Sequence, residues 1–252
     1  MKLTETNYFS PEAESIYMGS TQYKRFRACE SQALAIISGR FVPETSTAML
    51  VGSYVDSYFS GTQEIFKLEY PELFTRGGEL KSEYIHANYI IRRIERDEQF
   101  LQALSGKTQV ILTGEIEGVP VKVKIDSLLP DRTVDLKVMK DFDNIYNPSY
   151  SAWEPFWQAW GYDIQGALYQ EIRRQNDGQR VPFGIAGATK EKPEPDIALF
   201  ELPQSSLDVA LDEIRANIAY YNGLKKGLFG PVGCGDCAWC RSQKKLKGWV
   251  TL

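Results

Sequence analysis

The fold is decided by two neighbouring stretches that read Gly114-Glu-Ile-Glu-Gly-Val-Pro-Val-Lys-Val-Lys-Ile-Asp126 and Thr133-Val-Asp-Leu-Lys137. Between residues 119 and 128 apolar side chains alternate with polar ones, which is the two-residue period of a β-strand. Residues 109–117 before it and 133–139 after it show similar alternation, and Gly118 supplies a tight turn. The pattern therefore predicts three consecutive strands in an antiparallel meander.

Helical patterns surround this meander. Helices are predicted, in chain order, over residues 21–38, 46–59, 81–104, 157–174 and 206–224. Two further strands are predicted over 184–189 and 197–202, with a loop over 141–155. We expect an α/β fold, a single domain over 1–252 with a central mixed β-sheet flanked by helices. Its parts would be a helical region 20–104, a core 107–202, and a C-terminal helix with a cysteine-rich tail 205–252.

Composition limits the class of protein. A chain of 252 residues with a hydrophobic fraction of 43% can form a globular core, as one domain or as two small ones. The formal net charge of −4 is not that of a protein that coats nucleic acid, although a DNA enzyme with an acidic metal site can have it. No apolar run approaches the roughly 20 residues of a membrane helix. Residues 1–20 lack a signal-peptide pattern, so a cytoplasmic location is expected.

The single histidine, His86, narrows the catalytic chemistry. A Ser-His-Asp triad, a Cys-His pair or a multi-histidine zinc site would each need it. It lies in a predicted helix without a nucleophile motif nearby, so we expect it to be structural or solvent-facing. The sequence also has no Gly-rich phosphate loop and no nucleophile elbow. Catalysis would therefore depend on carboxylates, lysines and cysteines.

Two carboxylates and a lysine stand out in the predicted meander. Asp126 ends one strand, and Asp135 lies in its hairpin neighbour, so both can converge on one hard cation. Lys137 lies two residues after Asp135 and thus on the same side of the strand, as Lys122 and Lys124 share the side of Asp126. Its ammonium could orient an attacking water or stabilise charge on a phosphate. The alternative is a solvent-facing strand on which Asp135 and Lys137 form a surface pair.

These residues carry a resemblance to a known family. Ile125-Asp126 followed by Val134-Asp-Leu-Lys137 resembles the core motif of PD-(D/E)XK nucleases. Gln165-Gly-Ala-Leu-Tyr169 resembles the Gln-x-x-x-Tyr helix motif of the exonuclease branch. Gly52-Ser-Tyr-Val-Asp56 is similar to the helix where that branch places Gly-x-x-x-His, with Asp56 at the histidine position. Together, residues 20 to 245 resemble RecE-like phage and prophage recombination exonucleases.

The resemblance implies a mechanism and a substrate. Asp126 and Asp135 would hold one or two Mg²⁺ or Mn²⁺ ions, and Lys137 would position the attacking water. Glu115 and Asp56 would be additional metal ligands. Gln165 and Tyr169 would contact the DNA backbone or brace the metal ligands. The implied activity is hydrolysis at double-stranded DNA ends for recombination or repair. The implied partners are a single-strand annealing protein and further copies of the chain. A nuclease of different polarity or endonucleolytic mode, or an inactive DNA-binding module, are the alternatives.

The four cysteines are Cys29, Cys234, Cys237 and Cys240. Disulfides explain so tight a C-terminal cluster poorly in a cytoplasmic protein. Four thiolates in a tetrahedral site suit Zn²⁺ or an iron–sulfur cluster. Some PD-(D/E)XK nucleases are similar, with one N-terminal and three C-terminal cysteines on a [4Fe–4S] cluster, although their C-terminal spacing is wider. The alternative is a buried Cys29 and a reduced, metal-free tail.

An aromatic run follows the meander and comprises Trp153, Phe156, Trp157 and Trp160. We expect these rings to be buried against the sheet. Stacking on frayed bases of DNA is the alternative.

Overall fold

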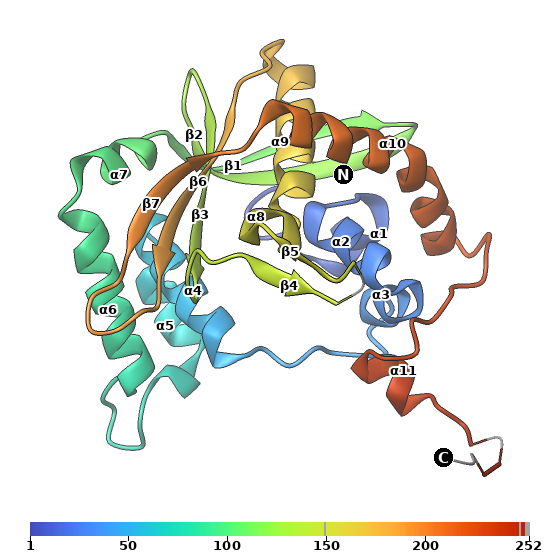
Figure 1. Cartoon of the computed structure of the whole chain (residues 1–252), viewed down its shortest axis with the longest axis horizontal. Helices are drawn as coiled ribbons and strands as arrows, with labels where there is room; N and C mark the ends of the chain where they lie inside the picture. Colours follow the sequence, from blue (N-terminus) through green and yellow to red (C-terminus); the bar gives the residue numbers. More distant parts are fainter. Residues whose placement is uncertain (149, 247, 250–252) are drawn as a thin grey trace. The chain divides into compact units, whose positions relative to one another are not determined.

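The computed structural model describes residues 1–148, 150–246 and 248–249 (Figure 1). The chain divides into two compact units by its internal contacts. Unit 1 comprises Met1–Pro43, Gly114–Lys122 and Asp212–Leu252, and unit 2 comprises Glu44–Thr113 and Val123–Leu211. The assignment of one domain to residues 1–252 stays a prediction.

Unit 2 is organised around a five-stranded sheet of order β1-β2-β3-β6-β7. Its strands are β1 (Lys107–Ile116), β2 (Val119–Leu128), β3 (Thr133–Met139), β6 (Phe183–Thr189) and β7 (Ile197–Glu201). β3 is antiparallel to β2 and parallel to β6, and β7 is antiparallel to β6. The sheet is therefore mixed, which confirms the predicted α/β fold class.

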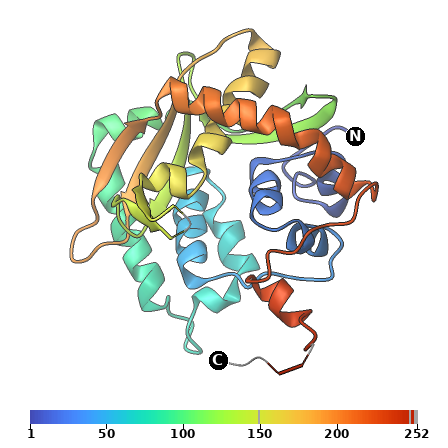
Figure 2. The same cartoon turned by 45° about the vertical axis from the view of Figure 1, so that its right-hand side comes forward.

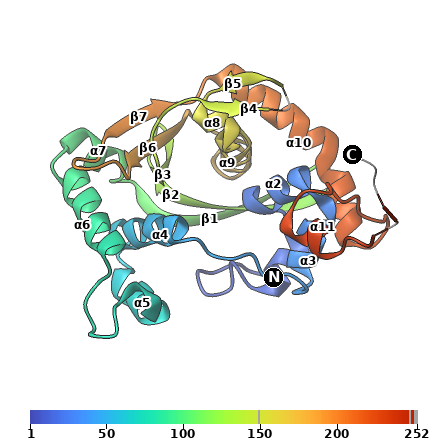
Figure 3. The ribbon, with the colours of Figure 1, turned by 60° about the horizontal axis from the view of Figure 1, so that its bottom comes forward.

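Helices cover both faces of this sheet (Figure 3). α4 (Thr47–Phe59) and α6 (Ser82–Glu95) pack on one face, in a core that includes Val134 and Leu136 of β3. α9 (Tyr162–Asp177) covers the other face. Successive side chains of a strand alternate between faces. Asp135 and Lys137 of β3 therefore project away from the apolar core that Val134 and Leu136 join.

Gly166 lets α9 approach the sheet closely. A β-carbon at this position would lie 2.5 Å from the ring of Phe183 on β6 and 2.9 Å from Leu207. Any larger residue would therefore push the helix away from β6. Gly166 lies within the Gln165–Tyr169 motif, so the same close approach determines how far the side chains of Gln165 and Tyr169 lie from the sheet.

Three predicted segments are divided in the structure. The helix predicted over 81–104 is two helices, α6 and α7 (Glu98–Ala103), because the Asp97 side chain caps the second at the amide of Phe100, 2.9 Å away. The helix predicted over 157–174 is α8 (Phe156–Ala159) and α9, divided at Gly161, whose φ of 64° interrupts the helix. The predicted loop 141–155 contains a short hairpin, β4 (Ile145–Asn147) and β5 (Ala152–Glu154).

The aromatic run is only partly buried, so its expected burial is wrong for two residues. Phe156 is buried against Phe142 and Phe200. Trp153 on β5 is 68% exposed, and Trp160 after α8 is 56% exposed. The hairpin and the break at Gly161 carry these two rings to the surface.

The remaining helices of unit 2 are α5 (Gln63–Glu69) and the 3-10 turn η1 (Pro71–Leu73). The expectation for His86 holds: its half-buried ring nitrogen Nε2 lies 3.1 Å from the carbonyl of Lys190, in a structural contact. No helix in the described part of the chain is long and apolar enough to span a bilayer.

Unit 1 joins the two ends of the chain (Figure 2). Its helices are α1 (Pro11–Ile16), α2 (Ser20–Ala28), α3 (Glu30–Ile37), the part of α10 (Gln204–Lys225) from Asp212 onward, and α11 (Ala238–Ser242). Phe26 of α2 stacks on Tyr221 of α10, with ring centroids 5.4 Å apart. The single helix predicted over 21–38 is interrupted at Cys29, whose extended backbone ends α2 and begins α3.

Lys122 is buried in unit 1, whereas the alternation places it on a polar face. It is 1% exposed, and its ammonium lies 2.7 Å from Glu14 Oε1 and 4.5 Å from the ring centroid of Tyr8. A segment absent from the predicted elements, α1 and the residues before it, supplies both partners. The polar face of β2 is therefore covered at this residue.

Candidate functional site

The β2–β3 ladder brings the two predicted carboxylates together. Ser127 pairs with Val134 and Leu128 with Thr133. Asp126 directly precedes Ser127, and Asp135 directly follows Val134, so the two aspartates come next to this pair on the two strands. The charge of Asp135 raises the pKa of Asp126, after burial, which shows that the two carboxyl groups interact. Their shared role in a metal site stays a prediction.

The carboxylate of Asp126 is held at both oxygens. The backbone amide of Leu136 donates to Oδ2 at 3.0 Å, in the position where a β-ladder partner would otherwise accept. The side-chain amide of Gln109 donates to Oδ1 at 3.4 Å. These two donors fix the direction in which the half-buried carboxylate points.

Asp135 is 1% exposed, so the interpretation of Asp135 and Lys137 as a solvent-facing pair is wrong. Its Oδ1 accepts a hydrogen bond of 2.6 Å from the side-chain amide of Gln165. Its Oδ2 is buried and contacts the ammonium of Lys137 in an ion pair. A buried carboxylate oxygen that interacts with a positive charge is suited to binding a cation.

The α9 motif braces this arrangement. Gln165 and Tyr169 lie one helical turn apart, and both side chains are buried. The Gln165 amide lies 3.0 Å from the Tyr169 hydroxyl, which itself donates to the carbonyl of Lys124 at 2.7 Å. Asp135 on β3 is thus linked through α9 to the backbone of β2.

Asp56 of α4 adds a third carboxylate to the site's electrostatics. Burial and, after it, the charge of Asp135 raise the pKa of Asp56 to about 6, while Lys137 and Lys124 oppose the shift. Burial also raises the pKa of Asp126 well above its ordinary value, with Asp135 and Asp56 adding to the effect. Burial and the neighbouring carboxylates therefore both disfavour the charged forms of Asp56 and Asp126.

Lys137 stays protonated in this setting. Burial alone would lower the pKa of Lys137, but Asp135 and Asp126 together raise it above its ordinary value. The aromatic ring of Tyr162 lies 5.3 Å from the ammonium, at cation–π distance. Sequence reasoning did not identify Tyr162 or Gln109. The position of Tyr162, three residues before Gln165 on the same helix face, is a signal that could have indicated it.

These residues fit a divalent cation bound through oxygen. The candidate ligands are the carboxylates of Asp56, Asp126 and Asp135, and hard cations such as Mg²⁺ and Mn²⁺ prefer such oxygen donors. The raised pKa values of two carboxyl groups and the buried Oδ2 of Asp135 both indicate a site that a cation would stabilise. Glu115 is exposed and belongs to unit 1, so its part as a further ligand stays a prediction.

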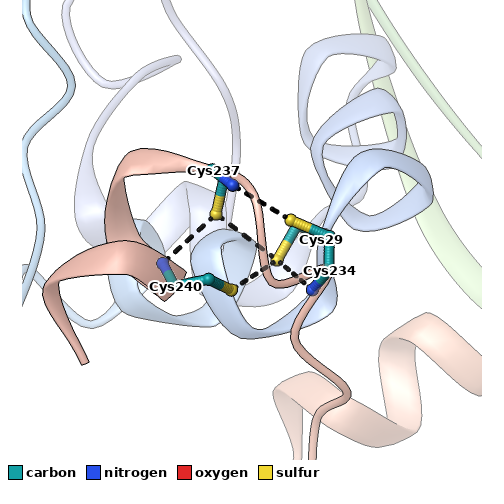
Figure 4. A group of neighbouring side chains, drawn as sticks. All are labelled: Cys29, Cys234, Cys237 and Cys240. Atoms are coloured by element: carbon teal, nitrogen blue, oxygen red, sulfur yellow. Dashed lines mark hydrogen bonds between the residues drawn. The ribbon is translucent and has the colours of Figure 1, made fainter. Parts of the chain in front are cut away.

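The four cysteines form a second candidate site, in unit 1 (Figure 4). Their sulfur atoms all lie within 4.8 Å of one another, and all four are free thiols. Cys29 Sγ is 3.6 Å from Cys240 Sγ and 3.8 Å from Cys237 Sγ. The sequence prediction that Cys29 joins the C-terminal cluster agrees with this geometry. The four-cysteine group could bind a metal.

Backbone amides support the cysteine cluster. The amide of Cys237 donates to Cys234 Sγ at 3.3 Å, and that of Cys240 donates to Cys237 Sγ at 3.4 Å. The Cys237 and Asp236 amides lower the pKa of the Cys234 thiol to about 7. A thiol with this pKa is readily deprotonated, and the thiolate is the form that binds metal.

The sequence matches the family described as a PDDEXK-like domain of unknown function (DUF3799) over residues 19–243. The crystal structure of a candidate exonuclease from Eubacterium rectale is similar to this chain, with 44% sequence identity, a TM-score of 0.95, and coverage of 100% of this chain and 97% of that chain. A second solved structure, that of SSO0001, is 13% identical over 75% of this chain and 84% of that chain, with a TM-score of 0.29. No curated protein matches the sequence.

Proposed function

The chain belongs to the PDDEXK-like domain family, and we propose that it is a divalent-metal-dependent deoxyribonuclease that hydrolyses phosphodiester bonds at double-stranded DNA ends. The observation that supports this most is the pairing of the buried Asp135 with Lys137 beside Asp126. Two acidic oxygen ligands can hold a divalent cation for phosphodiester cleavage, and an ammonium beside them can orient the attacking water or stabilise charge on the phosphate.

Each residue of the site has a distinct task in this proposal. Asp126 and Asp135 bind the cation, with Asp56 and Glu115 as further ligands. A bound Mg²⁺ or Mn²⁺ supplies charge stabilisation for the phosphate and lowers the pKa of a water molecule. Lys137 carries a permanent positive charge, so it orients the attacking water and stabilises the growing negative charge on the phosphate.

Gln165 and Tyr169 act through other residues. The Gln165 amide holds Oδ1 of Asp135, which leaves Oδ2 toward Lys137. The Tyr169 hydroxyl anchors the motif to the backbone of Lys124. Both side chains are buried, which supports the bracing role over direct contact with the DNA backbone.

Exonucleolytic resection is the mode we favour, because the Eubacterium rectale protein of similar fold is described as a candidate exonuclease. Resection would leave single strands for an annealing protein in recombination or repair, as in phage systems. A ring-like assembly of several copies would keep the enzyme on its substrate. These partners are part of the proposal.

For the cysteine cluster we propose a bound metal, a [4Fe–4S] cluster or Zn²⁺, with a structural role. Four converging thiols from Cys29 and the C-terminal tail support this, because such sites hold chain segments together. Metal and sulfide analysis of protein purified without oxygen tests it. Absence of iron, zinc and sulfide from folded protein would contradict it.

The DNA substrate is tested with end-labelled linear duplex and with closed circular DNA, each in Mg²⁺ and in EDTA. Asp135→Ala protein is the control for contaminating nuclease. We expect Mg²⁺-dependent loss of the linear duplex alone, and the label lost first gives the polarity. Cutting of circles would favour an endonuclease, and absence of cutting by folded protein would favour an inactive DNA-binding module.

A further inference from the structure

Gln109 has an unusual backbone for its place in the fold. Its φ is 53°, in the left-handed region, although it lies inside strand β1. Two other non-glycine residues in the described part of the chain share a positive φ, Glu117 and Ser151. Both lie in hairpin turns, where a positive φ reverses the chain. Gln109 lies in no turn, and a positive φ inside a strand marks a local irregularity such as a β-bulge.

A left-handed conformation is unfavourable for glutamine. Its β-carbon crowds the carbonyl group in this region, and it lacks the short side chain that lets asparagine adopt the region more easily. Strained residues of this kind persist where surrounding interactions fix them, and they cluster at functional sites. We therefore expect an interaction of the Gln109 side chain to fix this backbone conformation.

The side chain of Gln109 reaches the candidate metal site. Its Nε2 donates to Asp126 Oδ1 at 3.4 Å, while the Leu136 amide holds Oδ2. Gln109 also lines a small cavity together with Asp56 and Asp126. A side chain on a regular strand would project from β1 in a direction fixed by the pleat. The positive φ of Gln109 changes that direction locally.

An amide is a suitable group for this position. It donates a hydrogen bond without adding charge, so it does not compete with a cation as lysine or arginine would. A carboxylate oxygen has two lone pairs, and the long hydrogen bond from Gln109 occupies one of them. The other lone pair of Asp126 Oδ1 remains for a metal ion.

We propose that Gln109 is a positioning residue for Asp126, and that its strained backbone directs the amide that orients this carboxylate toward a divalent cation. The inference rests on the proposed function, because Asp126 is a metal ligand only in that proposal. Groups that orient a metal ligand typically change metal affinity or activity 10- to 100-fold when removed. The strain is then the cost of holding the ligand in place.

The test compares Gln109→Gly with the matched control Ser151→Gly. Both changes relieve a positive φ, but Ser151 is exposed in the β4–β5 turn. The readouts are Mn²⁺ affinity by isothermal titration calorimetry and the thermal midpoint in EDTA. We expect each variant to keep its midpoint or gain about 2–4 °C. Only Gln109→Gly should lose Mn²⁺ affinity, by about 10-fold or more.

Gln109→Leu separates strain from hydrogen bonding, since it keeps the side chain's bulk and the strain but has no donor. It should lose Mn²⁺ affinity without a gain in midpoint. Unchanged Mn²⁺ affinity in both Gln109 variants, or a lower midpoint for Gln109→Gly, would overturn the inference and leave the proposed function standing. Wild-type protein that binds Mn²⁺ but cuts no DNA would contradict the proposed function alone. Wild-type protein that binds no Mn²⁺ would overturn both.

Discussion

The carboxylate site of unit 2 and the cysteine cluster of unit 1 are built in opposite ways. The carboxylates are carried on β2, β3 and α4, and hydrogen bonds from Leu136, Gln109 and Gln165 hold two of them. The cysteines lie at a helix junction and in a tail, and their partners are mainly one another and adjacent amides. The sulfur atoms of the four cysteines all lie within 4.8 Å of one another, which is close enough to share one ion.

This difference shows two ways to prepare a metal site. Burial, together with the repulsion of like charges, raises the pKa values of Asp56 and Asp126, so a rigid sheet and bracing hydrogen bonds hold these carboxyl groups together. Protonated thiols converge without such repulsion. The carboxylate site thus takes its order from the fold, whereas we expect the cysteine cluster to give order to the tail once metal binds.

The largest expected effect comes from Asp135→Asn. It removes a proposed ligand and a charge that adds to the effect of burial on the pKa values of Asp56 and Asp126, but it keeps the volume and an acceptor for Gln165. We expect DNA cleavage to fall at least about 100-fold, with the thermal midpoint in EDTA unchanged or higher. Asp143→Asn, at an exposed carboxylate, is the control and should cleave at the wild-type rate. Full activity of Asp135→Asn protein would show that the Asp135 carboxylate is not needed for cleavage.

The next prediction concerns Cys237→Ser, which removes one of four thiolates. We expect loss of the bound metal and faster hydrogen exchange over residues 226–246, since the tail loses its attachment to Cys29. Cleavage of DNA should fall far less than in Asp135→Asn protein. Metal analysis and hydrogen-exchange mass spectrometry measure this, with Ser242→Ala as the control in the same short helix. Unchanged exchange of the tail after complete metal loss would contradict a structural role.

A smaller effect is expected from Gln165→Leu, which takes the amide from Asp135 Oδ1. We expect Mn²⁺ affinity to fall about 10-fold and stability to fall by about 1–3 kcal/mol. Gln170→Leu is the matched control, because Gln170 is also buried on α9 but donates to the carbonyl of Val181. It should lose similar stability and retain Mn²⁺ affinity. Equal affinity losses in both variants would indicate a general effect of α9 packing.

The smallest effect is expected from Gly166→Ala. The added methyl group would lie 2.5 Å from the Phe183 ring, so α9 must shift away from β6. We expect a loss of about 1–3 kcal/mol in the free energy of unfolding, measured by chemical denaturation. Gly230→Ala has open space around the new methyl group and should be neutral. A neutral Gly166→Ala would show that the contact of α9 with the sheet is not tightly packed.

The fold class and the proximity of Asp126 to Asp135 could be predicted from the sequence because both follow from short-range periodicity. Alternation over β2 and β3 determines the strands, the turn between them determines their register, and the register places Asp126 beside Asp135. The Gln165 and Tyr169 spacing of one helical turn likewise determines a shared face. Local patterns of this kind can be recognised in the sequence without knowledge of the tertiary structure.

Other features depend on contacts between distant segments, which periodicity does not encode. Lys122 is buried because residues near Tyr8 and Glu14 cover it, more than 100 residues earlier in the chain. Gln109 takes a left-handed backbone inside a strand, for which glutamine gives no sequence signal. The breaks at Cys29 and Gly161 require knowledge of what packs on each side. Tertiary context decided each of these cases against the local pattern.

In our proposal the carboxylates of unit 2, and not the thiols of unit 1, hold the catalytic divalent cation. Crystals soaked in Mn²⁺ and measured at the manganese absorption edge test it most directly. We predict an anomalous peak in contact with the carboxylates of Asp126 and Asp135, absent from Asp135→Asn crystals. A manganese peak at the cysteines alone, or no peak in crystals of active protein, would contradict the claim.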